Sequence, residues 1–164
     1  DIHGEIDSLR QLLKDLGYDE EGNHPNDRLL VFVGDYCDRG PDSPAVIALV
    51  AKLVKATRAF AIVGNHEINL LRNDAKDGSG WYFDSQDAHD QDKFAPYQRA
   101  DEQERQEIRN FLLSLPIALE REDIRIVHAA WDSEAIAQVR TNNDKPLLEL
   151  YQKWHSATQT KIAI

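Results

Sequence analysis

Apolar residues recur with helical spacing near the start of the chain. Within residues 5–16, one helical face carries Ile6, Leu9, Leu12, Leu13 and Leu16. Gly17 follows at the position where a helix cap commonly stands. The same kind of spacing predicts further helices over residues 45–55, 102–115, 133–140 and 147–154.

Short continuous apolar runs alternate with these helices. Residues 29–33 and 59–63 form two such runs, and each ends in a glycine, Gly34 or Gly64. We expect both runs to be strands buried on both faces, and residues 124–127 to be a third strand. The order strand, helix, strand predicts an α/β fold built from parallel βαβ units. Ligands bind at the carboxyl ends of the strands in such sheets.

Residues 73–100 have a different character, because aspartates alternate there with glycines and with the aromatic run 81–83. We expect a long irregular loop near the carboxyl ends of the strands. It would serve as a lid or specificity loop that shapes substrate choice and not the chemistry. The spacing of its aspartates lacks the pattern of an EF-hand, so a solvated surface is favoured over a calcium site.

Composition limits the possible partners and the compartment. The chain has 164 residues, which suits one domain, and a net charge of -10, which argues against binding of long nucleic acid. It contains no apolar run of membrane-spanning length, and we expect no membrane partner. Cys37 is the single cysteine, which excludes an internal disulfide and favours the cytoplasm. Because the chain lacks methionine and begins at Asp1, we expect it to be truncated.

Four clusters of oxygen and imidazole side chains stand beside small residues, and three of them follow a predicted strand. They are residues 1–4, 34–40, 64–67 and 128–130. In an extended segment Asp1 and His3 point the same way and can reach one metal ion. Asp35 stands at the exit of a buried strand, where a carboxylate is costly unless it is paired or bound to metal.

The mixture of carboxylate, imidazole and amide ligands favours a hard or borderline divalent cation over a thiolate site. We expect two divalent metal ions, with manganese favoured and iron or zinc as alternatives. Two ions held close together would stabilise the attacking and leaving oxygens of a phosphoryl transfer.

The series D-x-H-G, G-D-x-x-D-R-G and G-N-H-E, with a later His, resembles the calcineurin-like metallophosphoesterases. It resembles in particular their phosphoprotein-phosphatase-type branch, which includes bacterial Ser/Thr phosphatases and bis(5′-nucleosyl)-tetraphosphatases. Residues 38–44 are especially similar to the bacterial tetraphosphatase type. The resemblance implies a β-sandwich flanked by helices. The whole chain, 1–164, would then be an incomplete catalytic domain with an acidic insertion at about 73–100.

The resemblance also implies roles for individual residues. The implied metal ligands are Asp1 and His3 for one ion, Asn65 and His128 for the other, and Asp35 between them. His66 would protonate the leaving oxygen, and Asp38 would orient its ring. Arg39 would bind the phosphate with its planar guanidinium group. Glu67 would support the metal ligands without contacting the metal ions itself.

The implied reaction is hydrolysis of a phosphate ester or phosphoanhydride by hydroxide bound to the dinuclear centre. The substrate stays open between a phosphoprotein and a small nucleotide such as a dinucleoside polyphosphate. A non-catalytic domain that binds metal or phosphate is the alternative from another functional class. The family supplies one more histidine ligand near its C-terminus, and His155 stands here in a different context.

Overall fold

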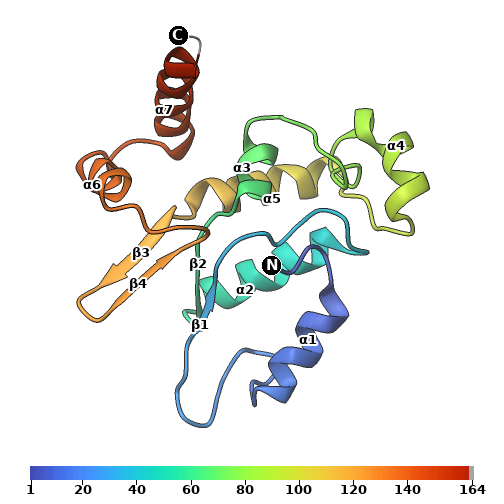
Figure 1. Ribbon diagram of the computed structural model, residues 1–164. Helices are drawn as coiled ribbons and strands as arrows, with labels where there is room; N and C mark the ends of the chain where they lie inside the picture. Colours follow the sequence, from blue (N-terminus) through green and yellow to red (C-terminus); the bar gives the residue numbers. More distant parts are fainter. Residues whose placement is uncertain (163–164) are drawn as a thin grey trace.

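The computed structural model describes residues 1–162, with side chains to residue 156 (Figure 1). The helices are α1 (Ile6–Asp15), α2 (Ser43–Lys55), α3 (Asn65–Leu71), α4 (Asp84–Phe94), α5 (Glu102–Ser114), α6 (Ser133–Thr141) and α7 (Leu147–Ile162). The strands are β1 (Leu30–Phe32), β2 (Ala59–Ala61), β3 (Ala118–Arg121) and β4 (Ile124–Val127). The chain is therefore of mixed α/β class, as the sequence predicts.

A parallel βαβ unit forms the centre of the molecule. β1 pairs with β2 in parallel, with Leu30 opposite Ala59 and Phe32 opposite Ala61. α2 connects the two strands and packs against β2, α1 and α5. This arrangement confirms the predicted strand order and puts the ends of β1 and β2 at one edge.

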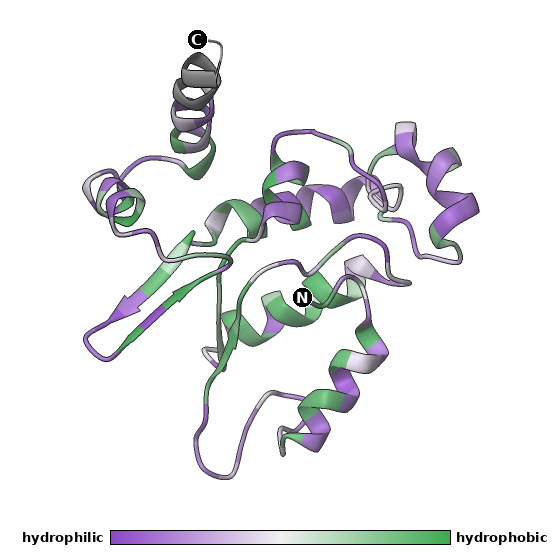
Figure 2. Ribbon diagram, viewed as in Figure 1, coloured by the Kyte–Doolittle hydropathy of each residue, from purple (hydrophilic) through white to green (hydrophobic). Residues whose placement is uncertain are grey.

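The helix α2 begins where its sequence provides a cap. The Asp42 carboxylate accepts a hydrogen bond from the Ala45 amide at 2.9 Å, and Pro44 stands in the first turn, where its missing N–H costs nothing. Val46 and Val50 are fully buried on its inner face. Figure 2 shows this helix as largely apolar, which fits its central position.

The expectation that β1 and β2 are buried on both faces is wrong. Val31 is 40% exposed and Phe60 is 52% exposed, whereas their neighbours Phe32 and Ala61 are buried. Successive side chains on a strand point to opposite faces, and α2 covers one face of this two-stranded sheet. Within residues 1–162, the opposite face carries apolar side chains that remain accessible.

β3 and β4 form a separate antiparallel hairpin, with Ala118 opposite Val127. The sequence predicts β4, whereas β3 has two charged residues in its four and gives no strand signal. In the described part of the chain, no helix combines the length and the apolar character needed to cross a membrane.

The segment 73–100 is not irregular throughout, because residues 84–94 form the helix α4. Figure 2 shows α4 as mainly hydrophilic, and its one buried residue is Asp90. A helix that is polar on almost every face lacks the apolar periodicity on which sequence prediction depends. For that reason its helical structure is not visible in the pattern of apolar residues.

Candidate active site

The N-terminal segment and the loops after β1 and β2 meet in close contact. The amides of Ile2 and His3 both donate to the Asp35 carbonyl, at 2.8 and 3.1 Å. Glycine makes this approach possible, since a Cβ on Gly40 would stand 2.0 Å from the His3 carbonyl oxygen. The small residues beside the polar ones in the motifs therefore let three chain segments share one site.

Four residues of this site have a left-handed backbone conformation although none is glycine. They are His3, Asp35, Asp38 and Arg39, with φ angles of 49°, 54°, 73° and 71°. Such conformations are costly for residues with a Cβ and persist where the surroundings impose them. The strain is concentrated where the side chains of chemical interest converge.

Glu67 is the fully buried carboxylate that holds two of these loops. Its Oε2 accepts hydrogen bonds from the amides of Asp35 and Gly64, both at 2.8 Å. Its Oε1 accepts one from the Tyr36 amide at 2.8 Å and one from the Cys37 thiol at 3.3 Å. Burial raises the pKa of that thiol, so Cys37 stays protonated as a donor.

Two groups of three side chains could each hold a metal ion, and they share Asp35. One group is His3, Asp35 and His66, and the other is Asp1, Asp35 and His128. Within each group the ligand atoms lie within 4.8 Å of one another. The Asn65 side-chain oxygen lies 3.0 Å from Nε2 of His128, which adds an amide ligand to the second group.

The histidines are oriented as metal ligands usually are. Nδ1 of His3 lies 2.9 Å from the Cys37 carbonyl, and Nδ1 of His128 lies 2.7 Å from the Val33 carbonyl. Donation to a carbonyl fixes the proton on Nδ1 and leaves a lone pair on Nε2 of a neutral ring, toward the site. Carboxylate, imidazole and amide groups converging in this way fit divalent cations.

His66 of the first group forms a buried histidine–carboxylate pair with Asp38. Nδ1 of His66 is 2.6 Å from Oδ2 of Asp38, and both side chains are buried. The hydrogen bond to Asp38 raises the pKa of His66, although burial acts in the opposite direction. Nε2 of this ring faces the Arg39 guanidinium. The geometry therefore leaves Nε2 as the atom available to a substrate.

The second oxygen of Asp38 is also occupied. The indole N–H of Trp81 donates to Oδ1 of Asp38 at 2.7 Å. Sequence reasoning missed this contact, because an aromatic residue such as Trp81 suits core packing, lid packing or the stacking of a nucleobase. The juxtaposition of an indole from the insertion with a carboxylate 43 positions earlier is a tertiary feature.

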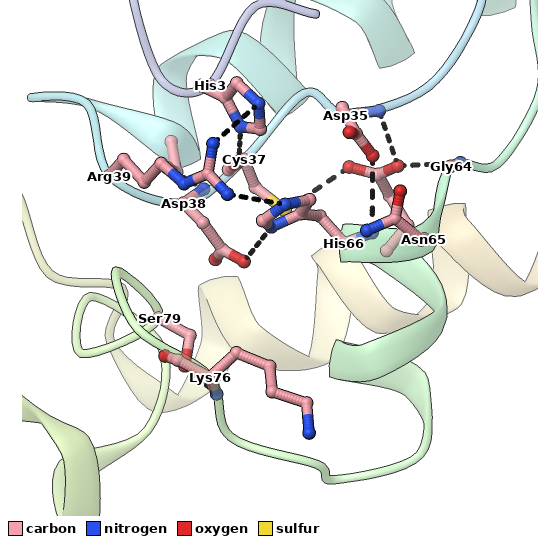
Figure 3. A network of polar contacts seen from close by, with 12 residues as sticks. His3, Asp35, Cys37, Asp38, Arg39, Gly64, Asn65, His66, Lys76 and Ser79 are labelled. Atoms are coloured by element: carbon pink, nitrogen blue, oxygen red, sulfur yellow. Dashed lines mark hydrogen bonds and ion pairs between the residues drawn. The ribbon is translucent and has the colours of Figure 1, made fainter. Parts of the chain in front are cut away.

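Arg39 projects its guanidinium over both histidines of the first group. Its Nη1 lies 3.4 Å from Nε2 of His3, and its Nη2 lies 3.3 Å from Nε2 of His66 (Figure 3). The residue is exposed, so the cation faces the solvent side of the site. This position suits a planar donor that receives an anion from solution.

The structure departs from one expectation about the N-terminal residues. The expectation that Asp1 and His3 lie in an extended segment is wrong at His3, whose φ is 49°, and the two residues fall in different groups. His155 lies on α7 and stacks against Tyr151, with ring centroids 5.6 Å apart. Neither three-residue group at the site includes it.

Another cluster, formed by Asp77, His89 and Asp90, lies in the acidic insertion. Lys93 already places its ammonium 2.7 Å from an Asp77 oxygen. The Asp90 carboxylate accepts hydrogen bonds from the Gly80 amide and the Gln86 side chain. These contacts satisfy the cluster without a metal ion.

Comparison with protein families decides the class of this site. The calcineurin-like phosphoesterase family matches over residues 1–164. The chain belongs to the calcineurin-like phosphoesterase family. This membership accords with the two groups that share Asp35, because a shared carboxylate can hold two cations close together.

Among curated proteins the chain is similar to bis(5′-nucleosyl)-tetraphosphatases called PrpE (asymmetrical). The protein from Oceanobacillus iheyensis is 49% identical over 75 residues, and the protein from Halalkalibacterium halodurans is 47% identical over 75 residues. Each match covers 44% of this chain and 30% of the relative. The matched part of the chain thus spans less than a third of either relative.

Proposed function

We propose that this protein hydrolyses a phosphate ester or phosphoanhydride with the help of two divalent cations. The observation that carries the proposal is the buried pair His66–Asp38 at two groups of possible metal ligands, which share Asp35. A phosphate between the cations and Nε2 of His66 would meet positive charge and a proton donor together. The family of the chain supports the same class of reaction.

The ions would be held by the side chains that converge at the loop ends. The proposed ligands are Asp1, His3, Asp35, Asn65 and His128, whereas His66, also in the first group, would serve in proton transfer. Divalent cations bound there would neutralise phosphate charge and make water a better nucleophile. We propose manganese, because hard oxygen donors accompany the imidazoles. Iron and zinc are the other candidates.

The chain's own residues would handle the proton and the phosphate. His66 would release a proton from Nε2 to the leaving oxygen, while the Asp38 carboxylate holds Nδ1. The Arg39 fork would bind two phosphate oxygens, which its position over the histidines allows. Glu67 would keep Asp35 in place by accepting a hydrogen bond from the backbone amide of Asp35.

The substrate that we propose is a dinucleoside polyphosphate. The support comes from the named activity of the relatives and from their identity of 47–49% over the matched segment. A phosphoprotein is the second candidate, supported by the motifs G-D-x-x-D-R-G and G-N-H-E that resemble the phosphoprotein-phosphatase branch. The single cysteine, Cys37, which forms no disulfide, favours the reducing cytoplasm.

The test uses the full-length protein, stripped of metal and then titrated with manganese, iron or zinc. Hydrolysis of diadenosine tetraphosphate, a phosphoserine peptide and an aryl phosphate would be measured for each metal. We expect metal-dependent turnover with the nucleotide preferred, and its loss in Asp35→Asn. Preference for the peptide would overturn the proposed substrate. Metal binding without turnover of any substrate would support the non-catalytic alternative.

A further inference from the structure

Trp81 connects the acidic insertion to the histidine–carboxylate pair. Its side chain is 1% exposed, and its Nε1–H donates to Oδ1 of Asp38 at 2.7 Å. The other Asp38 oxygen lies 2.6 Å from Nδ1 of His66. The carboxylate is therefore held at both oxygens, once by the indole and once by the imidazole.

The loop that carries Trp81 is itself fixed on two sides. The Gly78 carbonyl accepts a hydrogen bond from the Arg39 amide at 3.0 Å. The Gly80 amide donates to Oδ2 of Asp90 at 2.7 Å, and the Asp90 side chain on α4 is fully buried. A hydrogen bond to a buried carboxylate is stronger than one between neutral groups. The helix α4 thus anchors the loop one residue before Trp81.

We propose that Trp81 is a positioning residue that sets the orientation of the His66 ring through Asp38. This inference rests on the proposed hydrolase function. A carboxylate bound at one oxygen can turn about its χ2 angle, which is a soft torsion. The second hydrogen bond, from the rigid indole, removes that freedom. His66 then presents Nε2 to the leaving oxygen in one direction.

The same geometry gives the acidic insertion a part in the chemistry. The path runs from Asp90 through the Gly80 amide to Trp81, Asp38 and His66, and each link is a hydrogen bond or a chain neighbour. Errors in the placement of a catalytic group are costly, with about 1 Å of displacement lowering rates by about a hundredfold. The insertion therefore supports proton transfer in addition to any effect on substrate choice.

The alternative is that Trp81 only fills space, since its ring packs edge-on against Tyr82 at 5.3 Å. Trp81→Phe keeps an aromatic ring and removes the N–H. Tyr82→Phe is the matched control, because it also removes one hydrogen bond from the insertion, the long one from the Tyr82 hydroxyl to the Arg105 carbonyl at 3.4 Å. The two variants therefore separate a loss at Asp38 from a general loosening of the segment.

Kinetics of the full-length, manganese-loaded protein test the role. The substrates are phenyl phosphate, whose leaving group needs a proton, and p-nitrophenyl phosphate, whose leaving group depends less on protonation. We expect Trp81→Phe to lower kcat for phenyl phosphate about tenfold, with a smaller loss for p-nitrophenyl phosphate and little change in KM or metal content. Tyr82→Phe should change neither rate. Equal losses on both substrates would overturn the positioning role.

A double-mutant cycle sharpens the result. If Trp81 acts through Asp38, adding Trp81→Phe to Asp38→Asn should give no further loss on phenyl phosphate. Additive losses would overturn the proposal.

An NMR measurement on the metal-free protein needs no turnover. The Nδ1–H signal of His66 should move in Trp81→Phe and stay in place in Tyr82→Phe. An unmoved His66 signal overturns the positioning role even where the wild-type enzyme is active. A moved signal without turnover of any substrate supports the positioning role and overturns the proposed function instead.

Discussion

Two regions of this molecule are rich in carboxylates, and apart from the buried Asp90 the insertion uses them differently from the site. At the site, Asp38 and Glu67 are buried and accept hydrogen bonds from imidazole, indole, thiol and backbone amides. In the insertion, Asp77 and Asp84 are exposed and pair with the cations of Lys93, Arg99 and Arg105. Each region even contains a histidine–aspartate pair, His66–Asp38 at 2.6 Å and His89–Asp77 at 3.5 Å.

The difference between the regions shows that burial, and not charge density, fixes the geometry of a carboxylate. Removing a carboxylate from water is costly, so a buried one is kept in one geometry by every donor around it. An exposed ion pair is screened and contributes little to stability. Hydrogen bonding by Lys93 lowers the pKa of Asp77, and hydrogen bonding by Arg105 lowers that of Asp84, but neither group is held in a fixed place by the core.

Glu67→Gln is expected to have the largest effect. Each Glu67 carboxylate oxygen accepts hydrogen bonds from two donors. In Glu67→Gln an NH2 group replaces one of these oxygens, and it cannot accept the hydrogen bonds of the two donors that it meets. Leaving buried donors unpaired costs about 1–3 kcal/mol each, so we expect a loss of at least about 2 kcal/mol in the free energy of unfolding. Urea titration measures it. Equal stability of the variant and the wild type would show that the buried carboxylate is not the anchor of the two loops.

The two histidine–aspartate pairs can be compared directly. His66→Asn should retain metal and lower kcat by about a hundredfold, the scale of lost general acid catalysis. His89→Asn, in the exposed pair, should leave kcat unchanged. An activated aryl leaving group should suffer less in His66→Asn than an alkyl one. Similar behaviour of the two variants would remove the functional distinction between the regions.

Arginine-to-lysine changes form another matched pair. Arg39→Lys should weaken inhibition by inorganic phosphate about tenfold, because a point charge cannot form the two parallel bonds of a guanidinium. Arg99→Lys makes the same change in the insertion, where the guanidinium pairs with Asp84 and Asp87. It should not alter the inhibition constant. An unchanged constant in Arg39→Lys would mean that this residue does not contact phosphate.

Much of the local structure could be predicted from the sequence, because the relevant signals are local. The apolar spacing in α1, α2 and α5 and the position of Pro116 just after α5 all lie within a few residues of the element they define. The motifs also follow short strands, and that placement brings Asp35 and Asn65 to one edge of a parallel sheet. For these residues the pattern and the topology point to the same site.

Other features depend on contacts between distant segments. The open face with Val31 and Phe60 depends on which layers cover the sheet, and an apolar run cannot show that. The left-handed conformation of His3 comes from its docking against the loop after β1, which moves it away from Asp1's group. The bond between Trp81 and Asp38 joins segments 43 positions apart. None of these leaves a trace in local periodicity.

The smallest effect is expected for Asp84→Asn, in the exposed pair with Arg99 and Arg105. Hydrogen bonding by Arg105 lowers the pKa of Asp84 below its ordinary value of 3.8. A group with a lowered pKa stabilises the fold above its unfolded pKa, and the stabilisation disappears as the pH falls through the lower folded value. Near neutral pH the variant should therefore melt slightly earlier than the wild type.

That difference should shrink as the pH falls below about 4, and also in about 1 M salt, where the screening length is about 3 Å. Differential scanning calorimetry of both proteins at low and high salt measures it. Because Asp84 is exposed, water and salt compete with both arginines for its charge, whereas they do not reach Glu67. A loss for Asp84→Asn as large as that for Glu67→Gln, or one that persists in high salt, would show that the insertion carboxylates are structural in the same sense as those of the site.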